Sequence, residues 1–139
     1  MFEPHPAFPP TSHALGELGL CHVRLQADGR WPWLVLIPRV GGARELEDLP
    51  PEDRAALTEE IVRAGAAVRA MGEALGRPVE KLNVGQLGNV TPQLHVHVVG
   101  RRADDPAWPG PVWGFGTATS HDAASLALAM ATARAALGL

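Results

Sequence analysis

Residues 93–99, with the sequence QLHVHVV, alternate strictly between polar and apolar side chains. This period of two is typical of a β-strand, and it places Gln93, His95 and His97 on one face and apolar residues on the other. Two residues correspond to roughly 6.5–7 Å along a strand, which is the size of a phosphoryl group with its oxygens. Neutral imidazole can act as a nucleophile, and protonated imidazole donates hydrogen bonds to phosphate oxygens. The stretch therefore predicts a strand that could hold a phosphate between two histidines.

The segments around this strand alternate between extended and helical patterns. Residues 19–27 alternate as a half-buried strand, and residues 31–38 (WPWLVLIP) form an apolar strand after an Asp-Gly turn. We expect these two strands to pair as an antiparallel hairpin. Residues 49–76 carry apolar side chains at steps of three and four between a Pro-Pro start and a glycine stop, which predicts one long amphipathic helix. The chain is extended again after Pro78, and the Ala- and Leu-rich residues 122–139 predict a terminal helix.

The composition sets the class of protein. The 139 residues are 46% hydrophobic, which predicts a single domain over residues 1–139. Within it we expect residues 1–12 to be an extended arm without a core or chemistry, and residues 120–139 to hold the C-terminal helix. With 12 Lys+Arg against 15 Asp+Glu, the net charge of −3 argues against nucleic acid as a partner. No apolar run approaches the roughly 20 residues of a membrane span. The single cysteine, Cys21, indicates a reducing compartment, so we expect a cytoplasmic protein.

The alternating histidines allow other interpretations. They can be solvated polar residues on an exposed strand face, or core side chains with satisfied hydrogen bonds. Two histidines of one strand can also bind zinc when a third ligand comes from elsewhere. The other histidines are scattered along the chain, at His5, His13, His22 and His121. Since no third ligand is evident, we assign no metal site.

A polar, glycine-rich connection leads into the histidine strand. It contains two asparagines and two glycines: Asn83, Gly85, Gly88 and Asn89. Backbone N–H groups in such a turn can approach a phosphate. The sequence resembles the histidine triad (HIT) family of nucleotide hydrolases and transferases, whose motif is His-φ-His-φ-His-φ-φ with φ hydrophobic, and residues 93–99 match it with Gln at the first His. A hairpin ending in Leu-Ile-Pro-Arg (36–39) and a Trp-Pro-Gly segment (108–110) extend the resemblance over residues 15–115.

The resemblance implies a role for each matching residue. His95 resembles the nucleophile that attacks the α-phosphorus and becomes transiently nucleotidylated, and His97 resembles the histidine that binds the phosphate region. Asn83 resembles a polar residue near the phosphate and the central histidine. Gly88 and Asn89 resemble a Gly-Gln pair that lines the same pocket.

Three positions depart from the family's pattern. Gln93 replaces the first histidine, which in the family supports the geometry of the nucleophile, and Asn89 replaces the usual Gln. Val90 stands where the family generally has Ser or Thr near the leaving group. Since valine cannot donate a hydrogen bond from its side chain, these departures affect the tuning of the nucleophile and the protonation of the leaving group.

In the family, the base and ribose sit against the first hairpin. This implies a set of candidate nucleoside-binding residues: Leu25, Gln26, Ala27, Asp28 and Leu36. Asp28 is either an acceptor for a ribose hydroxyl or a turn residue that shapes the hairpin. Trp108 and Trp113 follow the histidine strand and are candidates for closing the pocket or forming a subunit interface.

The resemblance also implies the fold and the reaction. The fold is α+β, with an antiparallel sheet of about five strands, the long helix on one face and the C-terminal helix beside it. The reaction is cleavage at the α-phosphate of a nucleoside phosphoramidate or dinucleoside polyphosphate through a nucleotidyl-histidine intermediate. No cofactor is required, although a divalent cation can accompany a polyphosphate substrate, and we expect a homodimer. Gln93 and Val90 suggest the alternative, a catalytically weak nucleotide-binding module.

Overall fold

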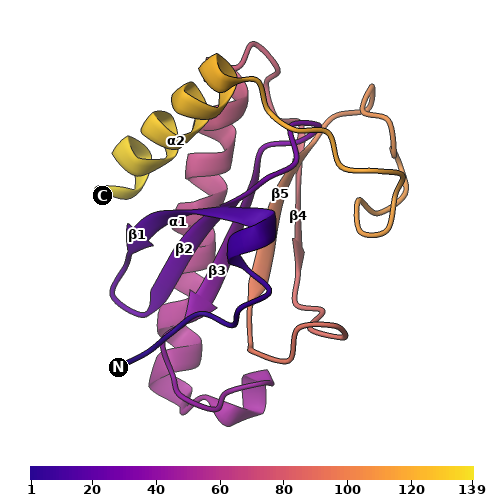
Figure 1. The fold of residues 1–139 in the computed structure, drawn as a ribbon. Helices are drawn as coiled ribbons and strands as arrows, with labels where there is room; N and C mark the ends of the chain where they lie inside the picture. Colours follow the sequence, from indigo (N-terminus) through magenta and orange to yellow (C-terminus); the bar gives the residue numbers. More distant parts are fainter.

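The computed structural model describes the whole chain from Met1 to Leu139 as one sheet with two helices (Figure 1). The strands follow the order β1-β2-β3-β5-β4, and each neighbouring pair is antiparallel. The elements in chain order are β1 (Ser12–Glu17), β2 (Cys21–Gln26), β3 (Trp33–Pro38), α1 (Pro51–Ala74), β4 (Lys81–Gly85), β5 (Val96–Arg101) and α2 (Ala123–Leu137). Short 3-10 turns lie at Pro9–Thr11 and Leu46–Asp48. The predicted α+β class with a five-stranded antiparallel sheet is confirmed.

Helix α1 covers one face of the sheet, and α2 packs beside α1 (Figure 1). The buried side chains of α1 include Leu57, Val68 and Met71, which recur at helical spacing in the main core. The helix begins at Pro51 and stops before Gly76, whose φ of +74° favours glycine, as the sequence predicts. Neither α1 nor α2 combines the length and the hydropathy that a membrane-crossing helix needs.

The opposite face of the sheet carries a second apolar cluster. Its buried members are Phe8, Trp31, Trp33, Val35, Ile37, Val99, Ala107 and Val112. Strand β2 pairs with β3 as the predicted hairpin, but it is buried on both faces and not half-buried as expected. Arg24 stays satisfied in this setting because its Nε donates to Ser12 Oγ at 2.7 Å. This burial was not expected from the sequence, because the polar residues of an alternating strand usually face solvent.

The N-terminal segment differs from the predicted arm without a core. Phe8 is buried in the second cluster, and β1 follows it and pairs with β2. The pairing register shifts by one residue between Ala14 and Gly16, which is a β-bulge. Since a bulge interrupts the alternation of side chains, no period-two pattern marked this strand in the sequence.

The histidine strand starts later than its alternating pattern suggests. Strand β5 begins at Val96, while Leu94 donates its backbone N–H to the carbonyl of Ala43 at 3.0 Å. Leu94, Val96 and Val98 belong to the main core beneath α1. The histidines between them therefore lie on the other face of the sheet, as the alternation predicts.

Candidate active site

A hollow of about 320 Å³ lies on the sheet face opposite α1, and we call it the histidine cavity because His95 and His97 both line it. Its walls are residues 7–11 of the N-terminal segment, the loop of residues 87–91 between β4 and β5, and Trp113 from the loop after β5. None of the lining residues is Arg, Lys, Asp or Glu. A ligand in this cavity would therefore meet neutral donors and aromatic surface.

The backbone fixes the hydrogen-bonding state of His95. Its Nδ1 lies 2.7 Å from the carbonyl oxygen of Gln93, and because a carbonyl only accepts, Nδ1 carries a proton. Burial lowers the pKa of His95, and the hydrogen bond to Gln93 opposes this shift only in part. The ring is therefore neutral near pH 7, and its other nitrogen, Nε2, keeps a lone pair. That nitrogen has no partner within the protein.

An indole fixes the opposite state in His97. Trp33 Nε1 donates to His97 Nδ1 at 2.9 Å, and because an indole N–H only donates, Nδ1 must hold the lone pair. Burial and, secondarily, the neighbouring His95 lower the pKa of His97 to about 3, so this ring is also neutral. Its single proton then sits on Nε2. His97 can donate a hydrogen bond there, but it has no free lone pair for attack.

The two rings thus form a complementary pair in one cavity. Their centroids lie 5.0 Å apart, at 74° to each other, closer than the roughly 6.5–7 Å expected from positions along an extended strand. His95 offers a nucleophilic nitrogen and His97 offers a donor. This arrangement suits attack on an electrophilic centre whose developing negative charge lies beside the donor.

The loop of residues 87–91 brings further groups to the cavity. Gly88, with φ +74°, turns the loop, and Gly88, Asn89 and Thr91 all line the hollow. Val90 also borders it but is 95% exposed. Thr91 was not a candidate from the sequence, although a hydroxyl directly after Val90 is a signal that could have drawn attention to it.

Trp113 closes the cavity on the side of β4. A Cβ added to Gly85 would lie 2.9 Å from the Trp113 ring, so the glycine makes room for the indole. Trp113 Nε1 is buried and has no hydrogen-bond partner in the protein. An unpaired indole N–H that borders a ligand cavity is a candidate donor to that ligand. The suggestion that Trp113 contributes to closing the pocket agrees with this position.

The family comparison agrees with this geometry. Residues 10–104 match the family model described as the HIT domain. The chain belongs to the HIT domain family. HIT domain proteins are generally nucleotide-binding hydrolases and transferases.

Solved structures of HIT proteins resemble this one over nearly the whole chain. A histidine triad protein from Bradyrhizobium japonicum has a TM-score of 0.91 and 35% identity, and the match covers 98% of each chain. One from Sinorhizobium meliloti 1021 has a TM-score of 0.88 and 41% identity, with 98% of this chain and 97% of that chain covered. One from Marinobacter aquaeolei VT8 has a TM-score of 0.86 and 40% identity, with 99% and 97% covered. A search of curated protein sequences gave no match.

Several hairpin residues expected at the nucleotide lie outside the histidine cavity of this HIT domain. Leu25 and Leu36 are fully buried in the main core beneath α1. Asp28 binds Arg30 at 2.8 Å and accepts from Thr119 N–H. Burial raises the pKa of Asp28, but these hydrogen bonds outweigh it and hold the pKa below its usual value. Neither Leu25 nor Asp28 lines the histidine cavity, and Gln26 is the one predicted hairpin residue that does.

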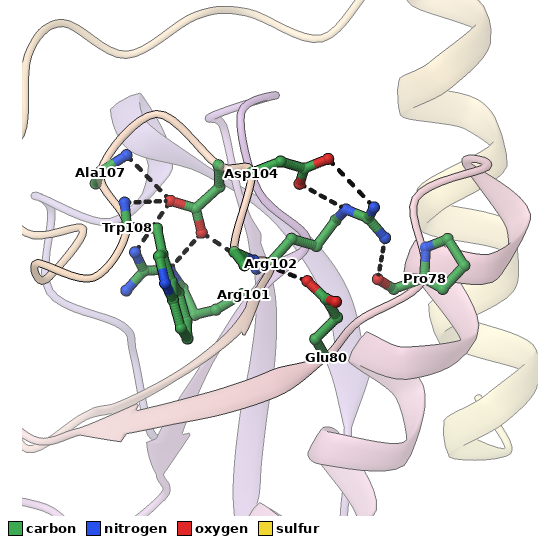
Figure 2. Close-up of polar contacts among 9 residues, drawn as sticks. Pro78, Glu80, Arg101, Arg102, Asp104, Ala107 and Trp108 are labelled. Atoms are coloured by element: carbon green, nitrogen blue, oxygen red, sulfur yellow. Dashed lines mark hydrogen bonds and ion pairs between the residues drawn. The ribbon is translucent and has the colours of Figure 1, made fainter.

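Asn83 also lies outside the histidine cavity. Its Oδ1 accepts a hydrogen bond from Arg101 Nη1 at 2.8 Å, which ties β4 to the end of β5. Arg101 is 1% exposed, and its Nε donates to Asp105 at 2.7 Å. Figure 2 shows Arg101 beside Trp108, with Arg102 in contact with Asp104 and Pro78. The role that the resemblance implies for Asn83, near the phosphate, stays a prediction.

Gln93 holds the N-terminal segment in place. Its Oε1 accepts from the backbone N–H of His5 at 2.7 Å, and its Nε2 donates to the carbonyl of Glu3 at 3.1 Å. Phe8, further along this segment, places its ring edge-on to His95 with centroids 5.0 Å apart. Gln93 thus acts on the cavity twice, through its own carbonyl and through the segment that it anchors. No local sequence pattern marks this contact, because the partners lie 88 and 90 residues apart.

Metal-binding groups do not gather in this HIT domain. No group of three or more His, Cys, Asp or Glu side chains is placed to hold an ion. Cys21 is buried and free, and burial raises the pKa of its thiol.

Proposed function

We propose that this HIT domain cleaves a nucleotide at its α-phosphate through a covalent intermediate on His95 Nε2. The observation that carries the proposal is the pair of opposite hydrogen bonds: Gln93 C=O accepts from His95 Nδ1, and Trp33 Nε1 donates to His97 Nδ1. They give His95 a free lone pair and His97 a free proton. The two histidines therefore have unequal roles although they share one face of the sheet.

The reaction has two balanced steps. In the first, His95 Nε2 forms a bond to the α-phosphorus while the bond to the leaving group breaks, and the leaving group departs with the electron pair and takes a proton from solvent. His97 Nε2–H donates to a non-bridging oxygen, whose charge grows in the transition state. In the second step, water attacks the phosphorus, the N–P bond breaks, and water gives up its proton. Nucleoside monophosphate leaves and neutral His95 is restored.

The neutral lining of the cavity favours a substrate with a singly charged α-phosphate. A dianionic phosphate group would lose water without gaining a cation, because no Arg or Lys borders the cavity. The α-phosphate of a phosphoramidate or of a dinucleoside polyphosphate carries one negative charge. These two classes are our proposed substrates. A divalent cation with a polyphosphate would be held by the substrate's own oxygens, so the scheme requires no resident cofactor.

The test is release of monophosphate from a panel of adenosine and guanosine phosphoramidates, dinucleoside polyphosphates and nucleotide sugars. Steady-state release from a phosphoramidate or a dinucleoside polyphosphate supports the proposal. A burst of leaving group without turnover would mean slow hydrolysis of the intermediate. Saturable binding of AMP with neither burst nor turnover would favour the alternative, a catalytically weak nucleotide-binding module, which the exposed Val90 suggests because it offers no donor to a leaving group.

We further propose that the protein is a cytoplasmic homodimer. The free Cys21 suits a reducing compartment. Strand β4 is an edge of the sheet, and exposed apolar side chains lie on it and on the loops beside it: Val84, Leu87, Trp108 and Phe115. Light scattering at micromolar concentration should give twice the 14.7 kDa chain mass, and the monomer mass alone would overturn the dimer.

A further inference from the structure

A second hollow lies where α1 ends and α2 begins, and it shares no lining residue with the histidine cavity. It has a volume of about 150 Å³ and adjoins a groove with which it shares Gly29, Arg30, Arg77, His121 and Ser125. The β2–β3 turn, the segment after α1, the end of β5 and the start of α2 surround it. We call it the arginine cavity because Arg30, Arg77 and Arg102 line it.

Two buried polar atoms border this cavity without a partner. Trp31 Nε1 and His121 Nε2 are both inaccessible to solvent, and neither makes a close hydrogen bond in the protein. Trp31 Nε1 faces the Asp105 carboxylate and helps to lower its pKa. Asp105 also lines the cavity, but it already accepts five hydrogen bonds, all from residues 101–108 of its own loop. Since buried polar groups are nearly always paired, these two atoms are candidates for hydrogen bonds to a ligand in the cavity.

Two of the three arginines that line the arginine cavity form ion pairs with carboxylates. Arg30 pairs with Asp28 at 2.8 Å, and Arg102 pairs with Asp104 at 2.8 Å, as Figure 2 shows for the second pair. The side chain of Arg77 makes no hydrogen bond or ion pair. Its guanidinium, a group with five donors, is therefore available to an anion.

A carboxylate at the rim is already engaged as a helix cap. Asp122 accepts from the backbone N–H of Ser125 at 2.8 Å and from its hydroxyl at 3.1 Å. An incoming anion thus meets Arg77, Trp31 Nε1 and His121 Nε2 around one cavity. The remaining wall includes the apolar side chains of Pro32, Leu75 and Val79. The lining of the cavity is therefore partly apolar and partly cationic.

We propose that the arginine cavity is a binding site for a small organic anion, separate from the site of catalysis. A phosphate or carboxylate group binds Arg77 and accepts from Trp31 Nε1, His121 Nε2 contributes a further hydrogen bond, and the apolar part of the ligand packs on Leu75 and Val79. This site does not depend on the proposed reaction, because none of its residues lies in the histidine cavity.

The test uses phenyl phosphate and benzoate as separate probes on the full chain labelled with ¹⁵N. The indole signal of Trp31 should shift and saturate with at least one probe, and the probe that acts identifies the head group. Arg77→Ala should raise the Kd of that probe about tenfold, the loss expected for a charged hydrogen-bonding partner. Arg77 is exposed and its side chain makes no hydrogen bond or ion pair, so this variant should fold normally.

Arg44→Ala is the matched control, since it removes an equal charge from an exposed side chain outside the arginine cavity. It should leave the Kd unchanged. The proposal is overturned if neither probe gives a saturable shift of the Trp31 signal, which would mean that water alone occupies the cavity. It is equally overturned if Arg77→Ala binds the probe as tightly as the native chain.

Discussion

The two ends of β5 both bury polar side chains, but they satisfy them differently. At the C-terminal end, Arg101 donates to Asp105 and Asn83, and Asp105 accepts five hydrogen bonds. At the N-terminal end, His95 and His97 each use one ring nitrogen within the protein and keep the other free. The saturated end holds a loop to the sheet, whereas the unsaturated end is ready for a ligand. The two ends of β5 therefore differ in free hydrogen-bonding groups, which are present at the candidate site and used up at the structural end.

Removal of His95 should cause the largest change. His95→Ala eliminates the nitrogen that bonds to phosphorus, so kcat/KM for monophosphate release should fall by at least about three orders of magnitude. His13→Ala, on β1 and outside the histidine cavity, is the control and should keep native activity. Native turnover in His95→Ala would show that the N-terminal end of β5 is not the reacting centre.

Removal of Arg101 should affect stability more than chemistry. Arg101→Met leaves the buried Asp105 carboxylate without its cation, which should lower the free energy of unfolding by about 3–5 kcal/mol in urea titrations. The solvent-screened Arg102–Asp104 pair gives a comparison, since Arg102→Met should lower the free energy of unfolding far less than Arg101→Met. Equal losses in the two variants would contradict the view that the C-terminal end of β5 is a structural anchor.

Changes at His97 should reduce turnover without abolishing it. His97→Ala removes one donor to the developing charge, so kcat should fall about 10²–10³-fold. Trp33→Phe keeps an aromatic ring but frees the tautomer of His97, and it should reduce kcat by only about 2–10-fold, the value of one neutral hydrogen bond. If Trp33→Phe were as damaging as His97→Ala, the indole would serve the substrate itself.

The smallest expected effect is in the pH dependence of activity, where the loss of activity in acid should begin at a lower pH than for an exposed histidine. Burial lowers the pKa of His95 below 6.5, so the nucleophile stays neutral, and activity is retained, at pH values where an exposed histidine is protonated. Activity is present above the lowered pKa and is lost as the pH falls through it. A plot of log kcat/KM against pH should therefore bend below pH 6.5, and a bend at or above pH 6.5 would contradict the burial argument.

Strand faces and the long helix could be predicted from the periodicity of the sequence. Contacts between residues distant in the chain could not. The alternation of residues 93–99 placed both histidines on one face, and helical spacing located α1. The family resemblance, and not periodicity, put Leu25 and Asp28 at the nucleotide, whereas Leu25 lies in the core and Asp28 pairs with Arg30 at the turn. No local pattern could show that Gln93 forms hydrogen bonds with the N-terminal segment, because the partners lie about 90 residues apart in the chain.

The central claim is that His95, and not His97, forms the bond to phosphorus. Its most direct test is rapid quench of the protein with a substrate labelled at the α-phosphate, followed by mapping of the label. The account predicts a nucleotidyl group on His95 that is labile in acid and stable in base, as phosphoramidates are. Label on His97 would contradict it, because the Trp33 hydrogen bond leaves His97 no nitrogen with which to attack.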